Sequence, residues 1–290
     1  MGQKQRKKKK RRTAKTADRH ALYQVSVQDP AFEVHLANRF FRRRVGREPL
    51  SLREDFCGTA LLCAEWVKSH PSRTALGVDI DPSVLAWGAE HVLSALDEGE
   101  RARVATVNGD VRDHHPERHD VVMALNYSYF CFKTRDTLRG YFATVREHLR
   151  PDGLFFLDLF GGWESQQILL EKRAVEDFTY VWDQAHFDPI TGDFRAHIHF
   201  RFADGTKLKE AFTYEWRLWT IPELRELLAE AGFGHVEVLW EEEDEVGQGT
   251  GTFKPRKHAV NDPGWNAYLL ASVEPPPRVA AKRAKRAEGG

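Results

Sequence analysis

The chain has 290 residues, of which 41% are apolar and 11% of the total are aromatic, enough for one large domain or two small ones with a proper core. Three cysteines without a Cys-x-x-Cys pair argue against a disulfide framework and against a zinc ribbon. No stretch approaches the roughly 18 consecutive apolar residues of a membrane span, and no apolar segment follows the N-terminal charges as in a secretory signal. We therefore expect a soluble, cytoplasmic protein.

The formal charge of zero conceals basic ends around an acidic body. Residues 1–20 carry ten basic side chains against one acid, and residues 278–290 carry five against one. The rest of the chain holds 28 basic and 41 acidic residues. Because the ends have little apolar surface to bury, we expect disordered basic tails at 1–18 and 275–290 around one domain at 19–274. Such tails suit a nucleic-acid or nuclear-targeting patch, or they only solubilise the protein without a specific partner.

Residues 19–46 place apolar and aromatic side chains at helical intervals ahead of the first strand. The Asp29-Pro30 pair is a typical helix start, so we expect one or two helices here. Either these helices lie across the mouth of a cofactor site, where Tyr23 and Gln24 would reach it, or their aromatic residues only pack them down.

The stretch 50–81 has the pattern of strand, glycine turn, helix, strand and acid. A short apolar run leads into Glu54 and the turn at 57–59, and a second apolar run ends at Asp79. Units of this kind bind nucleoside cofactors at the carboxyl ends of their strands. Asp79 follows Gly58 by 21 residues, close to the spacing of about 20 expected for a ribose-binding carboxylate.

The alternation of strands and helices continues to about residue 160. We expect a helix from Pro82 to Leu96, strands at 104–107 and 119–125, a helix at 135–149, a turn at 151–153 and a strand at 154–159.

Between 176 and 217 the alternation breaks, and three strand-like runs are separated by turn residues. An Asp-Gly pair between two of the runs is a strong hairpin signal, so we expect an antiparallel β-ribbon inserted as a lid. After it we expect a helix from Thr220 to Gly232, a strand at 236–240, a loop at 241–262 and a final strand at 265–273.

Five landmarks in order carry a resemblance to a known family. They are the turn at 54–60, Asp79, Asp110, the segment Leu125–Ser128, and the Leu-Arg-Pro-Asp-Gly run at 149–153. With them the chain resembles the class I S-adenosylmethionine-dependent methyltransferases over about residues 20–273. The resemblance implies an α/β, Rossmann-like fold: a seven-stranded, mostly parallel sheet with an antiparallel last strand, helices on both faces and the antiparallel insertion at 176–217.

The resemblance also implies S-adenosylmethionine as the cofactor and gives roles to individual residues. Glu54 would hold the methionine ammonium, and the amides of Gly58 and Thr59 would take its carboxylate with help from Arg53. The cofactor-binding residues implied in this way are Arg53, Glu54, Gly58, Thr59, Asp79, Ile80, Asp110, Val111, Leu125 and Asn126.

At the nucleoside end, Asp79 would accept both ribose hydroxyls and Asp110 the adenine amino group, with Ile80 and Val111 against the ring. Because methyl transfer is an in-line displacement that depends mainly on positioning, no residue is identified as catalytic. The candidates are Tyr127, Tyr129 and His186, with Trp182 as a further contributor to the lid or cleft. We expect no metal site, since His114, His115 and His119 fit no metal motif and suit a solvated loop.

Phe56 and Ala60 stand where the family has its first and third glycines, and only Gly58 is retained. Without a Gly-x-Gly-x-x-Gly pattern, a dinucleotide is disfavoured as the ligand. The segment 126–129 reads Asn-Tyr-Ser-Tyr, which differs from the Asn-Pro-Pro-Tyr or Asp-Pro-Pro-Tyr of adenine-N6 enzymes.

These patterns predict a methyltransferase that modifies nitrogen or oxygen of a small molecule, because the folded body is acidic and repels phosphates. One alternative is an RNA or protein methyltransferase recruited by the basic tails, which otherwise predict only weak, non-specific RNA contact. A second alternative is an inactive binding scaffold, for which Phe56 is the best support.

Overall fold

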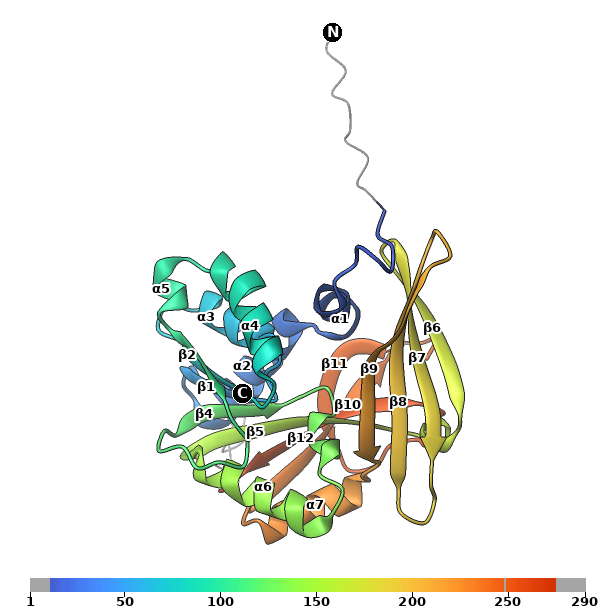
Figure 1. The fold of residues 1–290 in the computed structure, drawn as a ribbon. Coiled ribbons are helices and arrows are strands. Elements are labelled where there is room, and N and C mark those ends of the chain that lie inside the picture. Colours follow the sequence, from blue (N-terminus) through green and yellow to red (C-terminus); the bar gives the residue numbers. More distant parts are fainter. Residues whose placement is uncertain (1–10, 248, 275–290) are drawn as a thin grey trace, which may run out of the picture.

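Two β-sheets organise the protein, whose computed structural model describes residues 11–247 and 249–274 (Figure 1). The large sheet has the strand order β11-β10-β12-β5-β4-β1-β2-β3, and the second sheet has the order β6-β7-β8-β9. The large sheet contains β1 (Ser51–Asp55), β2 (Thr74–Asp79), β3 (Val104–Asn108), β4 (His119–Ala124), β5 (Leu149–Gly161), β10 (His235–Glu243), β11 (Gly249–Arg256) and β12 (Trp265–Ser272). The second contains β6 (Leu169–Val175), β7 (Phe178–Phe187), β8 (Asp193–Phe202) and β9 (Lys207–Arg217).

Helices connect these strands. They are α1 (Arg19–Val27), α2 (Pro30–Val45), α3 (Leu61–Lys68), α4 (Pro82–His91), α5 (Glu98–Arg101), α6 (Arg135–Glu147) and α7 (Ile221–Glu230). Short 3₁₀ turns cover η1 (Leu93–Ala95), η2 (Ser128–Cys131) and η3 (Trp163–Gln166). The expected helix from Pro82 to Leu96 is therefore an α-helix to His91 followed by a 3₁₀ turn.

Strand directions confirm the α/β fold. The five neighbouring strands β5, β4, β1, β2 and β3 are parallel to one another, whereas β12 pairs antiparallel with both β5 and β10. The antiparallel last strand is thus as expected, but the sheet has eight strands instead of seven. The addition is β11, in a segment expected to be a loop, which pairs antiparallel with β10 at the edge. Few of its residues are apolar, and pairing with β10 places Lys254 and Arg256 beside Glu242.

The end of the 149–153 run also differs from its expected turn, because β5 runs through it. Leu149 pairs with His119 of β4, and pairing resumes between Leu154 and Val121. The residues between form a bulge within the strand rather than a reversal of the chain. Gly153 is needed here, since a Cβ at this position would lie 3.0 Å from the carbonyl oxygens of Arg150 and His119.

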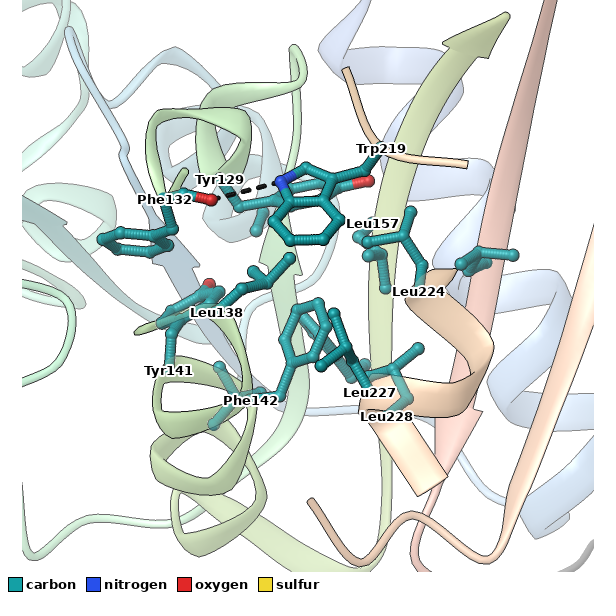
Figure 2. Close-up of a cluster of buried hydrophobic side chains, with 14 of the residues drawn as sticks. Tyr129, Phe132, Leu138, Tyr141, Phe142, Leu157, Trp219, Leu224, Leu227 and Leu228 are labelled. Atoms are coloured by element: carbon teal, nitrogen blue, oxygen red, sulfur yellow. Dashed lines mark hydrogen bonds between the residues drawn. The ribbon is translucent and has the colours of Figure 1, made fainter. Parts of the chain in front are cut away.

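Helices cover both faces of the large sheet. On one face Leu52 and Phe156 pack with α2 and α3, and on the other Phe155 and Val122 pack with α6 and α7. Figure 2 shows part of the second core, in which Trp219 Nε1 donates to the carbonyl oxygen of Phe132 at 3.1 Å. The alternation of side chains along each strand therefore decides which helices a residue meets.

The second sheet stands beside the carboxyl ends of the parallel strands (Figure 1). Its three longer strands follow the runs expected within 176–217, including the hairpins. The fourth strand, β6, begins at Leu169 and was not expected. Most of its residues are exposed at the sheet edge, so its sequence lacks the alternation that marks a half-buried strand.

Helix α1 lies between the large-sheet helices and the second sheet (Figure 1). Leu22 packs into the second sheet's core with Ile198 and Phe200. On the other side, Trp87 Nε1 of α4 donates to Asp18 at 2.9 Å. Of the expected tails, 1–10 and 275–290 lie outside the described residues, but Arg12 forms ion pairs with Glu176 and Asp177 of the second sheet.

Two buried histidines lie at the amino end of β4. His119 begins β4 and His148 follows α6, and both are buried. His119 is therefore not part of a solvated loop. The amide of His115 donates to His148 Nε2 at 3.0 Å, and within the described residues neither ring nitrogen of His119 has a partner. Burial, followed by the charge of Arg53, lowers the pKa of His119 to about 4 and that of His148 to about 3.

The lowered pKa of His148 predicts how the stability of the protein changes at acidic pH. Above pH 6.5 His148 is neutral in both states, so it contributes no pH dependence to stability. Below that pH His148 binds a proton in the unfolded chain but stays neutral in the folded protein. We expect the free energy of unfolding of the wild type to fall, relative to His148→Asn, by about 1.4 kcal/mol per pH unit between about pH 6 and 4. Urea titrations at several pH values measure this difference, and parallel pH curves for the two proteins would contradict it.

Two features are absent from the described residues. Within 11–247 and 249–274, no helix combines the length and apolar character needed to cross a membrane. In the same part of the chain, no three His, Cys, Asp or Glu side chains are grouped so that they could hold a metal ion.

Candidate functional site

The turn between β1 and α3 keeps a glycine-like backbone without the glycines. Phe56, Gly58 and Ala60 have φ values of +59°, +53° and +57°. Such angles cost a residue with a Cβ about 1–2 kcal/mol. The Phe56 ring lies 5.8 Å from those of both Phe132 and Tyr141, and this packing compensates for its strain. The substitutions at positions 56 and 60 therefore preserve left-handed conformations in the turn.

Helix α4 packs directly on this turn through Gly88. A Cβ built on Gly88 would lie 2.5 Å from the Thr59 carbonyl oxygen and 2.8 Å from its carbonyl carbon. Because both atoms belong to the backbone, any side chain at position 88 must displace the turn.

We expect Gly88→Ala to lower the free energy of unfolding by about 1–3 kcal/mol and to weaken cofactor binding, since it moves the Gly58–Thr59 amides. Gly140 is the matched control, because it lies in α6 with nothing within 4 Å of its Cβ position. There, alanine should stabilise the protein by about 0.5–1 kcal/mol. Urea unfolding and calorimetric titration test both variants, and two variants of equal stability would contradict the prediction.

Asp79 joins the turn to the end of β2. Its carboxylate accepts from the amides of Gly58 at 2.8 Å and Asp81 at 2.9 Å. Ile80 beside it is 70% exposed, which leaves an apolar surface free at the edge of the sheet. A Cβ at Gly58 would meet no atom within 4 Å, so the turn opens onto free space.

Asp110 lies beyond the end of the neighbouring strand β3. Its carboxylate forms an ion pair with Arg112 at 2.5 Å, and the hydrogen bonds from Arg112 hold the pKa of Asp110 below its usual value. Because β2 and β3 pair in parallel up to Asp79 and Asn108, Asp79 and Asp110 share one edge of the sheet.

Arg53 lies in the interior, on the α6 side of the sheet. It is 0% exposed, its Nε donates to Asp55 at 2.7 Å, and Nη2 donates to the carbonyl of Val111 at 3.2 Å. Tyr141 completes this group with a hydroxyl bond to Asp55 at 2.9 Å. Arg53 thus supports Val111 from beneath the expected adenine site, and its charge is neutralised by Asp55.

Glu54 points to the opposite side of the sheet, toward α3. One of its oxygens accepts from the amide of Cys63 at 3.2 Å and from its thiol at 3.0 Å. Among the described residues no Lys or Arg pairs with Glu54, and burial raises the pKa of this carboxyl to about 8. A cation that approached it would favour the ionised form.

The segment after β4 is held by a carboxylate of β5. Asn126 and Tyr127 have φ values of +57° and +59°, and their amides donate to the two oxygens of Asp158 at 2.8 and 2.9 Å. Burial raises the pKa of Asp158 to about 7. Sequence reasoning missed Asp158, although it is the single acid within an apolar run at 154–160.

A cavity of about 470 Å³ lies between this segment and the second sheet. Asn126 and Tyr127 form part of its wall, and the Tyr127 hydroxyl donates to Asn266 at 2.6 Å. Further aromatic walls come from Tyr23, Phe160, Tyr180, Trp182, Tyr214 and Trp216. Several of these aromatic residues were not singled out from the sequence. Alternation along the strands could have indicated them, because it places Tyr180 and Trp182 on one face of β7, and Tyr214 and Trp216 on one face of β9.

The other two catalytic candidates do not line this cavity. Tyr129 is buried, and its hydroxyl donates to the Asp158 carbonyl oxygen at 2.7 Å. His186 is exposed on β7. By contrast α1 reaches both parts of the site, because Tyr23 lines the cavity and Gln24 Nε2 donates to Thr59 at 2.8 Å.

Comparisons with known proteins point to a methyltransferase domain. A family model described as a methyltransferase domain matches residues 57–155. A malonyl-[acyl-carrier protein] O-methyltransferase of Geobacter sulfurreducens is 30% identical over 201 residues. That match covers 69% of this chain and 61% of the relative, so the chain matches less than two thirds of its relative's length.

Solved structures share the fold. An S-adenosylmethionine-dependent methyltransferase from Clostridium acetobutylicum superimposes with a TM-score of 0.63 at 15% identity, covering 88% of this chain and 98% of that one. An amino pentose methyltransferase from Micromonospora echinaspora, solved with S-adenosylmethionine bound, gives a TM-score of 0.61 at 17% identity, covering 88% and 96%.

The residues present suit S-adenosylmethionine. Its sulfonium and ammonium are cations, and the site offers the carboxyl of Glu54, which has no Lys or Arg partner in the described part of the chain, together with aromatic faces such as Tyr127. The open turn at Gly58 offers amide groups near the start of α3, and Asp79 and Asp110 follow adjacent strands. Fold, turn and comparisons together indicate a methyltransferase, because residues 57–155 match a methyltransferase domain and the chain shares the fold of solved S-adenosylmethionine-dependent methyltransferases.

Proposed function

We propose that the protein transfers a methyl group from S-adenosylmethionine to nitrogen or oxygen of a small molecule bound between the two sheets. The observation that carries this proposal is the 470 Å³ cavity, which is walled by Asn126 and Tyr127 on one side and by the second sheet on the other. A cavity of this size suits a small molecule rather than a nucleic-acid strand.

Each part of the site has a proposed role in binding. Glu54 holds the ammonium of the cofactor, and the amides of Gly58 and Thr59 hold its carboxylate. Asp79 accepts the ribose hydroxyls and Asp110 the adenine amino group. The remaining proposed contacts are those of Arg53, Ile80, Val111, Leu125 and Asn126.

When bound, the cofactor supplies an electrophilic methyl group. The protein's contribution is to hold the acceptor in line with it and to exclude water, for which the aromatic walls of the cavity are suited. Tyr127 is the proposed contact of the reacting groups, since it lines the cavity directly after β4. No general base is assigned.

The charges of the cavity favour an amine or hydroxyl acceptor over a carboxylate. Glu164 and Glu171 line it, and Arg173 is the single Lys or Arg among its described residues. Arg173 already donates to the carbonyl of Ser26 and lies over the ring of Tyr180. An anionic acceptor would therefore meet two carboxyl groups and one guanidinium that is already partly engaged.

A transfer assay with methyl-labelled cofactor tests the proposal against three pools: a metabolite extract, total RNA and total protein. We expect label in the metabolite pool, with amines and alcohols above carboxylic acids, and loss of that label in Tyr127→Ala. Label confined to RNA or protein, and abolished by deleting 1–10 and 275–290, would instead support the tail-recruited alternative. No transfer, with cofactor still bound, would support a binding scaffold.

A further inference from the structure

The end of α1 and its connection to α2 carry buried polar atoms without partners in the described part of the chain. Ser26 is 6% exposed and lines the cavity, yet within the described residues its Oγ has no hydrogen-bond partner. In the same part of the chain the buried Oε1 of Gln28 has none either. Buried polar atoms of this kind are rare unless a ligand or water completes them.

Glu33 is a third polar side chain in this region. It lies in the first turn of α2 and is 9% exposed. Among the described residues no Lys, Arg or His forms an ion pair with it, and no hydrogen bond reaches its carboxyl group. An isolated buried carboxylate is costly unless a cation or several donors accompany it.

Strand alternation places two other carboxyls on the side of the sheet that α2 covers. Glu54 shares a face of β1 with Leu52, and Asp158 shares a face of β5 with Phe156. Leu52 and Phe156 both belong to the core beneath α2, so all three acids lie on the α2 side, near the carboxyl ends of β1 and β5. Burial, then repulsion from Glu54 and Asp158, raises the pKa of Glu33 well above its usual value.

We propose that Glu33 is a cofactor-positioning residue whose carboxylate, together with that of Glu54, binds the ammonium of the methionine part of S-adenosylmethionine. The ammonium offers three N–H donors. Glu54 has one oxygen engaged by Cys63, whereas Glu33 has no partner within the described chain, so it supplies the acceptor that Glu54 alone does not. The inference rests on the cofactor and not on the identity of the acceptor.

The test pairs one variant with two ligands that differ only in the ammonium. Calorimetric titration compares S-adenosylhomocysteine with its deaminated analogue, which keeps the carboxylate and the nucleoside. We expect Glu33→Gln to weaken S-adenosylhomocysteine about 10- to 100-fold and to leave the deaminated analogue within about twofold. Glu226→Gln, an exposed change on α7 at the opposite face, should alter neither.

A second measurement is the number of protons released when the ligand binds. Bringing an ammonium to Glu33 and Glu54 favours their ionised forms, so binding of S-adenosylhomocysteine to the wild type should release protons near pH 7. Titrations in buffers of different ionisation enthalpy measure this release, which should be smaller in Glu33→Gln and absent for the deaminated analogue.

Several outcomes would overturn the proposal. These are unchanged affinity in Glu33→Gln, an equal loss for both ligands, or an effect limited to the KM of the acceptor. Glutamine resembles the neutral carboxyl that burial favours, so the variant should fold, which thermal unfolding checks. If it does not, Glu33→Asp keeps the charge on a shorter side chain and should show the same selective loss for the ligand with the ammonium.

Discussion

Asp79→Ala is expected to weaken binding of S-adenosylhomocysteine by about a hundredfold or more. The substitution removes two proposed charge-assisted hydrogen bonds to ribose hydroxyls, worth about 1.5–3 kcal/mol each. It also removes the acceptor of the Gly58 amide, which lies 2.8 Å from the carboxylate and belongs to the cofactor turn. Asp79→Asn keeps one acceptor oxygen and should give an intermediate loss.

The control for Asp79 is its neighbour Asp81. Asp81 caps α4 by accepting from the amide and hydroxyl of Ser83. Asp81→Ala should therefore cost about 1 kcal/mol of stability with little change in affinity. Calorimetric titration and urea unfolding separate the two effects. If Asp79→Ala bound the ligand as the wild type does, the proposed ribose contact would be wrong.

Asp158→Ala is expected to lower the free energy of unfolding by about 2–4 kcal/mol and to reduce turnover. The amides of Asn126 and Tyr127 would lose the carboxylate that accepts from both of them, in a segment whose left-handed conformations already store strain. Because both residues line the cavity, relaxation of the segment would move them away from the reacting groups.

Graded substitutions test the role of Asp158. Asp158→Asn keeps one acceptor oxygen and should cost about half as much as alanine. Asp152→Ala is the matched control, because Asp152 lies on the same strand but is exposed and pairs only with Arg47 among the described residues. It should change stability by less than about 1 kcal/mol. Equal losses at positions 152 and 158 would contradict a specific role for Asp158.

Much of the fold could be predicted from local patterns. The apolar run at 119–125 becomes β4, buried along its whole length, and the Asp-Gly hairpin lies between β8 and β9 as expected. These signals are strong because buried strands and tight turns restrict residue types directly. By contrast β6 and β11 are edge strands with mostly exposed side chains, so pairing with a neighbour defines them and their own sequence does not.

The turn at 54–60 was likewise predicted in part from the sequence and in part only by the tertiary structure. Its spacing to Asp79 and Asp110 indicates a nucleoside site, but Phe56 and Ala60 depart from the expected glycines. The structure resolves this departure, since both residues adopt the left-handed backbone and the Phe56 ring is packed against Phe132. A backbone angle depends on such contacts from distant segments, and these leave no local signature.

The sequence by itself determined the α/β fold, the order of the cofactor landmarks and the presence of a β insertion, because each depends on periodicity or on residues close together in the chain. Only the tertiary structure decided which side chains share the site. It enclosed the cavity between Tyr127 and the second sheet, and it placed Asp158 beneath the Asn126–Tyr127 segment. It also brought Glu33 of α2 to the same side of the sheet as Glu54. The physical reason is that burial and charge depend on neighbours that folding brings together from distant parts of the chain.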